Sequence, residues 1–472
     1  MMIGAFGSPN NTIRDHDDFT GGASDRKWPD MPGSAVSLLT QPQLAFDDAA
    51  EMGITFLVPD YFQMDFGVNP IYSMKYMDMA HNAGLKVKVW DTGLGTPLNF
   101  RYSVKHNIWD TTWARKYVRH PSFGGIHMVD EPALHHKDCL AKKVSKWESE
   151  FPSASVFINL HSSYGGASII GGKGEPGEDR DAYRYFVETL AKELKLNPLS
   201  FDHYPFEAKE YHWDGLSKNY FKDLALIRRV ASDRGVVSHS YLLSSGHWKY
   251  AKSILSIAEM RWQVAVHMAF GYESFSHYAT DLGWNDYEHF FTEGRAKITT
   301  RTQLENRRGS LWYTIRNINR EIRKWGHIYM RFAPNWIGTA FVLAENAKNN
   351  PWFNLIDKQD LIKISDLAGV TNITCSQDIL IGSFEDAVKN KGFYIANAVN
   401  PMTIQNAWSV PAQNRLPANI TIRFTQEYRY AQIFERGVSR VAKLEEDKLT
   451  IDIPPCDGMF VIPLRSNKEA IK

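Results

Sequence analysis

The residues best suited to chemistry are two acidic side chains that each come after a short apolar run. Glu131 follows the apolar and small residues 124–129 and precedes a proline, and Asp202 precedes Pro205 in a similar run. A carboxyl group at the mouth of a partly apolar pit has a raised pKa, so it can hold a proton near neutral pH and donate it. We therefore predict that Glu131 is a catalytic acid and that Asp202 is a second catalytic carboxylate.

Two carboxyl groups on either side of a glycosidic bond are the usual machinery of glycoside hydrolysis. Retaining enzymes hold them ~5–5.5 Å apart, and inverting enzymes hold them ~6.5–9.5 Å apart. Asp281, Asp60 and Asp91 also follow apolar runs and are alternatives to Asp202 as the second carboxylate. Glu273 opens its run instead of ending it, so we expect it at the opposite end of the fold.

Each acid also has a structural explanation. Asp readily occupies a helix N-cap, so Asp130 or Glu131 could begin the next helix, although a cap accounts for only one of the pair. Asp202 could order the neighbouring His203 or bind a sugar hydroxyl group. We predict that Asp130 supports Glu131 as a hydrogen-bonding residue or as a helix cap.

A wider set of polar and aromatic residues stands near the ends of the apolar runs, and we predict that this set binds a carbohydrate substrate. Aromatic rings would stack on the sugar, because they bury a large area at little entropic cost, and the Asn and His side chains would bond hydroxyl groups. The set consists of Asp60, Trp90, Asp91, Asp130, Asn159, His161, His203, Tyr204, Tyr241, Trp248, His277 and Tyr278.

The elements that must position these residues alternate between strands and helices as far as about residue 330. The predicted strands are residues 3–6, 54–61, 85–91, 124–132, 155–161, 199–206, 236–243 and 272–281. Helical periodicity separates most of them, as in residues 183–194, and the last helix is predicted from Gln303 to Trp325. This pattern predicts a (β/α)8 barrel, in which function gathers at the carboxyl ends of the strands. A doubly wound sheet is the competing fold, but it requires a phosphate loop after the first strand, and residues 4–9 do not form one.

The sequence pattern changes after Asn335. Helical periodicity fades, and short apolar strands appear between Gly, Pro, Asn and Asp residues, which is typical of an antiparallel β-sandwich. Asp457 and Gly458 predict a hairpin turn before the last strand. We predict a catalytic barrel over residues 1–333 and a C-terminal β-sandwich over residues 334–472.

Composition excludes several classes of protein. The chain has 472 residues, a net charge of +1 and 43% hydrophobic residues, so we expect no nucleic-acid partner, no membrane span and no long disordered region. The three cysteines are far apart and contain no CxxC pair, so a disulfide framework is not expected. The first residues lack the features of a signal peptide. Localisation is therefore cytoplasmic, or periplasmic or secreted if a signal has been removed, and the oligomeric state stays open.

We expect neither a cofactor nor a metal. Residues 172–177 match GxGxxG but contain a proline and lack the strand–turn–helix context of a dinucleotide site. His135, His136 and Asp138, or His16 among its neighbouring acids, suggest a metal only weakly, because neither group has the spacing of three convergent ligands.

The segments GGIHMVDEP, FINLHSSYG and LSFDHYPF, followed by a β-sandwich, resemble the (β/α)8 glycoside hydrolases related to clan A, in particular bacterial proteins with a DEP motif. The resemblance implies that Glu131 stands where clan A has its acid/base glutamate after the fourth strand, with Asp130 in place of the usual asparagine. Clan A places its nucleophilic glutamate at the seventh strand, whereas residues 236–248 contain no Asp or Glu.

We therefore predict a glycoside hydrolase that uses Glu131 and, with the seventh-strand acid missing, Asp202. A non-catalytic carbohydrate-binding barrel is the alternative, and a metal-dependent hydrolase is a third hypothesis. The sugar, the linkage and the stereochemical outcome stay open.

Overall fold

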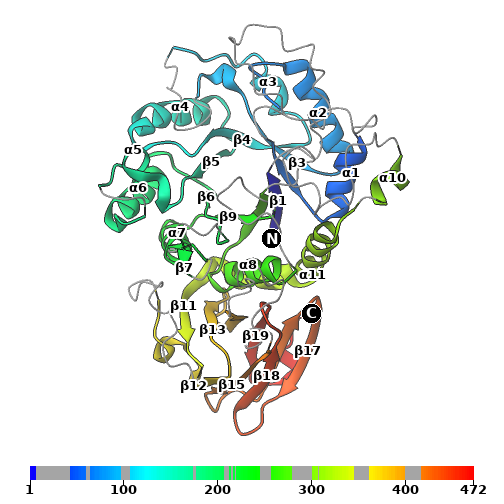
Figure 1. Cartoon of the computed structure of the whole chain (residues 1–472), viewed down its shortest axis with the longest axis vertical. Helices are drawn as coiled ribbons and strands as arrows, with labels where there is room; N and C mark the ends of the chain where they lie inside the picture. The colour runs from blue at the N-terminus through cyan, green and yellow to red at the C-terminus, as the bar shows by residue number, and fades with distance from the viewer. Residues whose placement is uncertain are drawn as a thin grey trace.

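In the computed structural model, the chain forms a barrel of parallel strands followed by antiparallel sheets (Figure 1). The structure describes residues 1–6, 43–59, 64–96, 107–173, 177–206, 212–213, 216–217, 219–244, 257–278, 300–306, 308–344, 361–398 and 416–471.

Eight parallel strands close the barrel in the order β1-β10-β9-β6-β5-β4-β3-β2, because β1 pairs with both β10 and β2. The strands are β1 (Met2–Phe6), β2 (Phe56–Val58), β3 (Lys86–Val89), β4 (Phe123–Asp130), β5 (Val156–Leu160), β6 (Leu199–Asp202), β9 (Ser238–Leu243) and β10 (Ser274–Tyr278). Each one overlaps a predicted strand, so the prediction of a (β/α)8 barrel is confirmed. A separate short hairpin consists of β7 (His212–Trp213) and β8 (Leu216–Ser217).

Helices surround the barrel (Figure 1). They are α1 (Gln43–Glu51), α2 (Pro70–Asn82), α3 (Ala114–Tyr117), α4 (Lys137–Glu150), α5 (Gly166–Ile170), α6 (Arg180–Glu193), α7 (Tyr220–Arg234), α8 (Ile257–Ala269), α10 (Arg301–Glu305) and α11 (Ser310–Phe332). The predicted apolar stripe of α6 is buried, from Tyr183 to Ala191. Gly235 ends α7 in the left-handed conformation, with φ of 63°, which a glycine adopts without strain.

The last barrel helix differs from its prediction of Gln303–Trp325. The chain forms the short α10 first, and α11 then runs from Ser310 to Phe332. Gly326 does not end this helix, because Ile328, Tyr329 and Phe332 beyond it are buried and stabilise another two turns. A glycine in a helix costs only about 1 kcal/mol, which the burial of three large side chains outweighs.

Two antiparallel sheets follow the barrel, as the sequence predicts. One sheet has six strands in the order β11-β13-β14-β19-β16-β17, and the other has three in the order β12-β15-β18. The strands are β11 (Trp336–Val342), β12 (Val370–Cys375), β13 (Ile379–Glu385), β14 (Lys391–Asn397), β15 (Ala418–Phe424), β16 (Tyr430–Glu435), β17 (Val438–Lys443), β18 (Lys448–Ile453) and β19 (Gly458–Leu464). The turn at Asp457 and Gly458 is not a hairpin, because β18 and β19 belong to different sheets.

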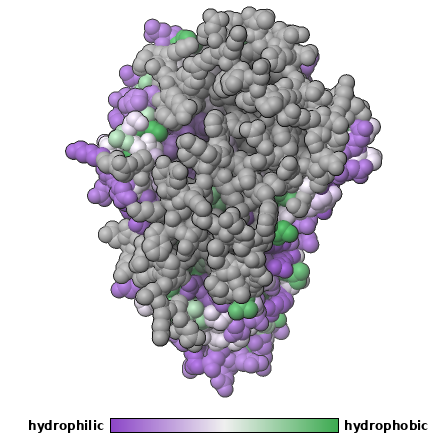
Figure 2. Space-filling model, viewed as in Figure 1, coloured by the Kyte–Doolittle hydropathy of each residue, from purple (hydrophilic) through white to green (hydrophobic). Residues whose placement is uncertain are grey.

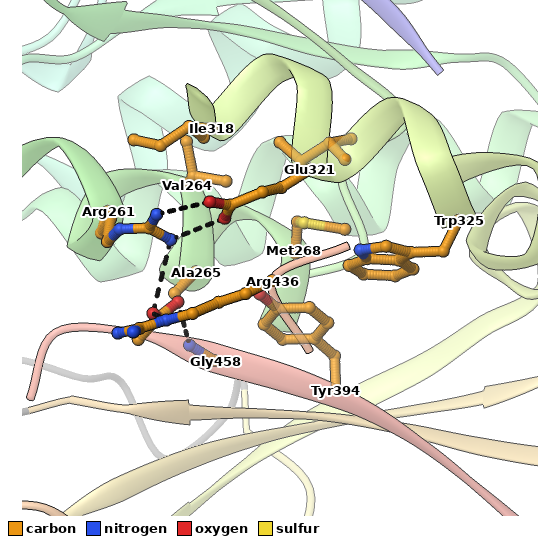
Figure 3. A pocket seen from close by; sticks show the side chains of 12 residues that line it. Arg261, Val264, Ala265, Met268, Ile318, Glu321, Trp325, Tyr394, Arg436 and Gly458 are labelled. Carbon is orange, nitrogen blue, oxygen red and sulfur yellow. Dashed lines mark hydrogen bonds and ion pairs between the residues drawn. The ribbon is translucent and has the colours of Figure 1, made fainter. Parts of the chain in front are cut away.

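Helices α8 and α11 pack on the six-stranded sheet. The indole of Trp325 stacks near Tyr394, Phe434 and Phe460, with ring centroids 6.0–6.3 Å apart. Beside it lies a cavity of about 30 Å³, which is large enough to admit water (Figure 3).

Ion pairs cross this cavity and join the barrel to the sheet. Arg261 of α8 donates two hydrogen bonds to Glu321 of α11, at 2.8 and 2.9 Å, and contacts Asp457 at 3.4 Å. Arg436 donates to the same Asp457 at 2.8 Å (Figure 3). The positive and negative groups thus neutralise one another, so we interpret this contact as structural.

The described surface in Figure 2 is mainly hydrophilic, with apolar residues scattered singly. Isolated exposed apolar residues are normal for a folded protein and do not mark an interface. Among the described helices, none has the length and apolar character needed to cross a membrane.

We predict that Gly382→Ala destabilises the fold by about 1–3 kcal/mol, because a Cβ atom there would lie 2.1 Å from the carbonyl oxygen of Ala269 in α8. Gly326→Ala is the control, since its Cβ would meet no atom closer than 3.6 Å and alanine favours a helix. Urea unfolding measures both, and equal stability of the two variants would contradict the close packing of β13 on α8.

Candidate active site

The pleat of each strand decides which predicted residues face the inside of the barrel, because alternate residues point to opposite sides. At the carboxyl ends of the strands, the inward-facing residues contact one another or the inner apolar cluster of Phe56, Val58 and Phe157. They are Trp90, Asp130, Asn159, His161, Asp202, Tyr204, Tyr241 and Tyr278, and they are joined by Glu131, which follows the end of β4 and is not bound by its pleat.

Glu131 has an unusual backbone conformation directly after β4. Its φ is +46°, in the left-handed region that residues other than glycine rarely adopt. Its N–H donates to the carbonyl oxygen of Asn159 at 2.8 Å, which continues the pairing with β5 beyond the end of the strand. Backbone strain of this kind persists where the surroundings enforce it, and it is common at functional sites.

Glu131 and Asp202 meet across β5, and a hydrogen bond joins their carboxyl groups. Burial and, to a smaller extent, the negative charge of Glu131 raise the pKa of Asp202 to about 7, although His161 and a hydrogen bond from Asn159 act in the opposite direction. Two adjoining carboxyl groups with little water around them cannot both ionise. The pair therefore holds one shared proton near neutral pH, and the titration belongs to the pair.

His161 lies beside this pair with a defined tautomer. Its Nδ1 is 3.0 Å from the carbonyl oxygen of Ser162, so it carries the hydrogen, and its Nε2 is 3.6 Å from Oε1 of Glu131. Burial lowers the pKa of His161. In the neutral ring the lone pair of Nε2 faces Glu131, so His161 can accept a proton from this carboxyl group or, when protonated, form an ion pair with it.

Asp130 pairs in register with Asn159 and is half-buried. Its charge contributes to raising the pKa values of Tyr204 and Tyr241, so it lies near both rings. Capping of the next helix does not explain either acid. The N-cap of the 3-10 helix Leu134–His136 is Ala133, and the N-cap of α4 is His136.

The predicted aromatic residues divide into two groups. Tyr204 and Tyr278 are half-buried, with ring centroids 5.1 Å apart, so they still present ring surface. Trp90 and Tyr241 are 2% exposed and form the floor of the site. The indole N–H of Trp90 donates to the carbonyl oxygen of Pro59 at 2.6 Å, so Trp90 is held in place and offers no open face for stacking.

Two other predicted residues, Asp91 and His277, point away from the barrel interior. Asp91 is buried behind β3, where it accepts hydrogen bonds from the Tyr117 hydroxyl and the backbone of Gly93, and burial raises its pKa to about 7. His277 is fully buried against α11 and contacts Asn319 and Ser244. Neither side chain is available to a substrate in this structure.

His203 also points outward. Its ring nitrogens contact Asp223, at 2.8 Å, and the hydroxyl of Ser217. Burial alone would raise the pKa of Asp223, but Arg180 and His203 together lower it to about 2, so Asp223 is ionised. Asp223 and Arg180 were not predicted, because they lie on helices and become neighbours of His203 only in the folded chain.

The predicted residues Asp60 and Trp248 lie outside the described residues, as does the alternative acid Asp281. Glu273 accepts a hydrogen bond from the backbone of Ser238 at the start of β9. It therefore lies at the opposite end of the barrel from the carboxyl pair, as predicted.

Sequence reasoning missed several polar residues of the barrel interior, among them Ser200, His239 and Ser276, which are all fully buried. Each stands two residues before a predicted site residue, Asp202, Tyr241 or Tyr278, and therefore on the same side of its strand. This spacing of two is the signal that could have identified them.

Among the described residues, no group of three or more His, Cys, Asp and Glu side chains is arranged to hold a metal ion. His16 lies outside the part of the chain that this search covers. The described site therefore consists of carboxyl, imidazole, amide and phenol groups.

Comparison with known proteins finds no matching family model and no matching curated protein. Several solved structures have a similar fold. An α-L-arabinofuranosidase from Thermotoga maritima has 8% identity and a TM-score of 0.41, with 89% of each chain covered. A β-L-arabinopyranosidase from Geobacillus stearothermophilus has 10% identity and a TM-score of 0.41, covering 93% of this chain and 95% of that one.

A γ-CGTase from alkalophilic Bacillus clarkii has 10% identity and a TM-score of 0.45, covering 99% of this chain and 70% of that one. Likeness at this level carries no argument about the reaction of the present chain, so any function must be argued from its own residues.

We predict that Asp202→Asn changes how stability depends on pH. The pKa of Asp202 in the folded protein, about 7, lies above its ordinary value of about 3.9. Between these values the folded chain binds a proton that the unfolded chain does not, so this group makes stability fall as pH rises from about 4 to 7. Removing it should increase the stability of the variant relative to wild type over that range by at least about 1 kcal/mol.

Urea unfolding at a series of pH values measures this difference. Asp181→Asn, at an exposed position on α6, is the matched control and should follow the wild-type curve. Parallel curves for wild type and Asp202→Asn would contradict the raised pKa.

Proposed function

We propose that the protein is a glycoside hydrolase whose reaction takes place at the carboxyl ends of the barrel strands. The observation that carries the proposal is the hydrogen-bonded pair of Glu131 and Asp202, which shares a proton near neutral pH. Glycosidic bonds are cleaved by one carboxyl group that donates a proton and another that remains ionised, and such a pair supplies both. The half-buried rings of Tyr204 and Tyr278 support a sugar-binding surface beside it.

In the proposed mechanism, Glu131 delivers the shared proton to the leaving oxygen. Its side chain is 23% exposed, so it can reach a substrate, and its strained backbone holds it at the mouth. Asp202 keeps the negative charge, which the hydrogen bond from Asn159 at 3.1 Å stabilises. His161, beside Glu131, helps to keep the carboxyl group in place.

We further propose that hydrolysis retains the anomeric configuration. Carboxyl groups in direct hydrogen-bond contact need to separate only a little to reach the ~5–5.5 Å of a retaining enzyme, but much more to reach the ~6.5–9.5 Å that an inverting enzyme needs for its water molecule. Asp202 then acts as the nucleophile, in place of the clan A glutamate that residues 236–248 lack. The resemblance to clan A at Glu131 supports its role as the acid, while the nucleophile comes from β6.

A non-catalytic carbohydrate-binding barrel is the second candidate. The specific observation in its favour is that the two carboxyl groups bond to each other, which satisfies both without a substrate. It requires saturable sugar binding without turnover of any linkage, and the experiments below separate it from hydrolysis.

We predict that Glu131→Gln lowers turnover by ~10²–10⁴-fold, because an amide cannot donate the proton, while sugar binding and thermal stability stay close to wild type. A screen of aryl glycosides and polysaccharides with both proteins measures turnover, and calorimetry measures binding. Glu188→Gln, on the exposed face of α6, is the matched control and should keep full activity. Near-normal turnover of Glu131→Gln would exclude its role as the acid.

We predict that the first product has the anomeric configuration of the substrate, as proton NMR immediately after mixing would show. Asp202→Gly should be inactive, and azide should restore activity by attacking from the space that the carboxyl group leaves. An inverted first product would show that Asp202 is not a nucleophile. Sugar binding by wild type with no turnover in the whole screen would favour the binding barrel instead.

A further inference from the structure

A string of buried polar side chains leads from Asp202 through the interior of the barrel. Nδ2 of Asn159 donates to Oδ1 of Asp202 at 3.1 Å, and the hydroxyl of Ser200 donates to Oδ1 of Asn159 at 2.8 Å. Ser200 Oγ lies 2.8 Å from Nδ1 of His239, whose Nε2 lies 2.9 Å from Oγ of Ser276. We call these four residues, Asn159, Ser200, His239 and Ser276, the interior chain.

With the amide nitrogen of Asn159 facing Asp202, the other hydrogen bonds of the interior chain have one consistent direction. Ser200 has a single hydroxyl hydrogen, which it gives to the carbonyl oxygen of Asn159, so it must accept a hydrogen from Nδ1 of His239. Burial, with a smaller contribution from Lys88, lowers the pKa of His239 to about 3, so the ring is neutral. Its Nε2 is therefore an acceptor and receives the hydrogen of Ser276. Every donor points toward Asp202.

The direction of the interior chain determines which end of the Asn159 amide faces the carboxyl pair. If Ser200 and His239 were apolar, the amide could turn over and present its oxygen to Asp202. An oxygen there would repel the ionised carboxylate, whereas the NH₂ group stabilises it. All four residues are at most 3% exposed, so water does not compete for these bonds.

We propose that the interior chain makes Asn159 a positioning residue, which holds Asp202 in the orientation and charge state of a nucleophile. The inference rests on the proposed hydrolase function and deepens it, because it explains how a carboxyl group away from water can become ionised when Glu131 takes the shared proton. Ser200, His239 and Ser276 act only through Asn159.

The charged and titratable groups around the interior chain come from several strands. Glu131 of the β4 end, His161 of the β5 end and the tyrosines Tyr204 and Tyr241 surround Asp202. Lys88 of β3, His127 of β4 and His267 of α8 act on His239. Lys88 donates to the carbonyl oxygen of Gly124 at 2.6 Å, and its charge disfavours protonation of His239, so the neutral ring persists at the pH of catalysis.

The first test compares Ser200→Ala with Ser240→Ala. Both serines are fully buried and each bonds to a buried histidine, but Ser240 contacts His267 outside the barrel interior. Ser200→Ala should lower kcat by ~10-fold or more with little change in KM, because a misplaced catalytic group slows the chemical step. The pKa of Asp202 should rise, so the acid limb of the pH profile should move to higher pH. Ser240→Ala should keep the wild-type limb.

His239 provides a rescue pair. His239→Asn can still place an N–H near Ser200 and should retain more activity than His239→Leu, which cannot. Equal losses in both variants, with an unmoved acid limb, would show that His239 is only a packing residue and would overturn the proposal.

A spectroscopic test is independent of activity. Nitrogen-15 NMR should show His239 with its hydrogen on Nδ1, the signal being identified by its absence in His239→Asn. Hydrogen on Nε2 would reverse the direction of the interior chain and overturn the proposal.

The charge state of Asp202 can also be followed by infrared spectroscopy. The carbonyl band of protonated Asp202, which Asp202→Asn lacks, should titrate at higher pH in Ser200→Ala than in wild type or Ser240→Ala. If wild type hydrolyses no glycoside but this band shifts, the proposed function fails while the positioning of Asp202 stands. If wild type hydrolyses a glycoside but the band does not shift in Ser200→Ala, the proposed function stands and the positioning of Asp202 by the interior chain fails.

Discussion

Two carboxyl groups in contact, in a place with little water, cannot both be charged, and the mouth of this barrel is organised around that constraint. In a closed barrel, a layer of inward side chains comes from alternate strands, so Glu131 after β4 and Asp202 on β6 meet across β5. β5, which lies between them, then supplies a neighbouring side chain for each carboxyl group. Asn159 donates to one carboxyl group, and His161 stands beside the other. Geometry and charge thus place a single proton on this pair at the carboxyl ends of the strands.

The strand ends could be predicted from the sequence, because an apolar run followed by an acid and, soon after it, a proline marks the end of a strand. The sequence predicted less well which residues at each strand end face the barrel interior. Adjacent residues were predicted together at Trp90 and Asp91 and at Asp202 and His203, but the pleat sends one member of each pair into the barrel and the other behind it. A register error of one residue exchanges the two. The division at residues 333 and 334 remains a prediction.

The helices and loops explain the remaining differences. Asp223 and Arg180 hold His203 from α7 and α6, and their roles depend on tertiary contacts that no local pattern shows. The extension of α11 to Phe332 likewise reflects burial against the six-stranded sheet, not helix propensity around Gly326. In the C-terminal sheets, β17 is mostly exposed, so it lacks the apolar run by which a strand is recognised in the sequence.

A barrel interior built only for stability would be filled with branched apolar side chains, yet here Ser200, His239 and Ser276 occupy it. Buried polar groups are tolerated when every one has a partner, and the net gain of each hydrogen bond is then small. The barrel therefore gains little stability from this arrangement compared with an apolar one. What it gains is direction, because once the amide nitrogen of Asn159 faces Asp202, each donor along the chain points toward that carboxyl group. The backbone of Glu131, held in the left-handed region, fixes the second carboxyl group opposite Asp202, and the hydrogen bond between the two groups completes the arrangement.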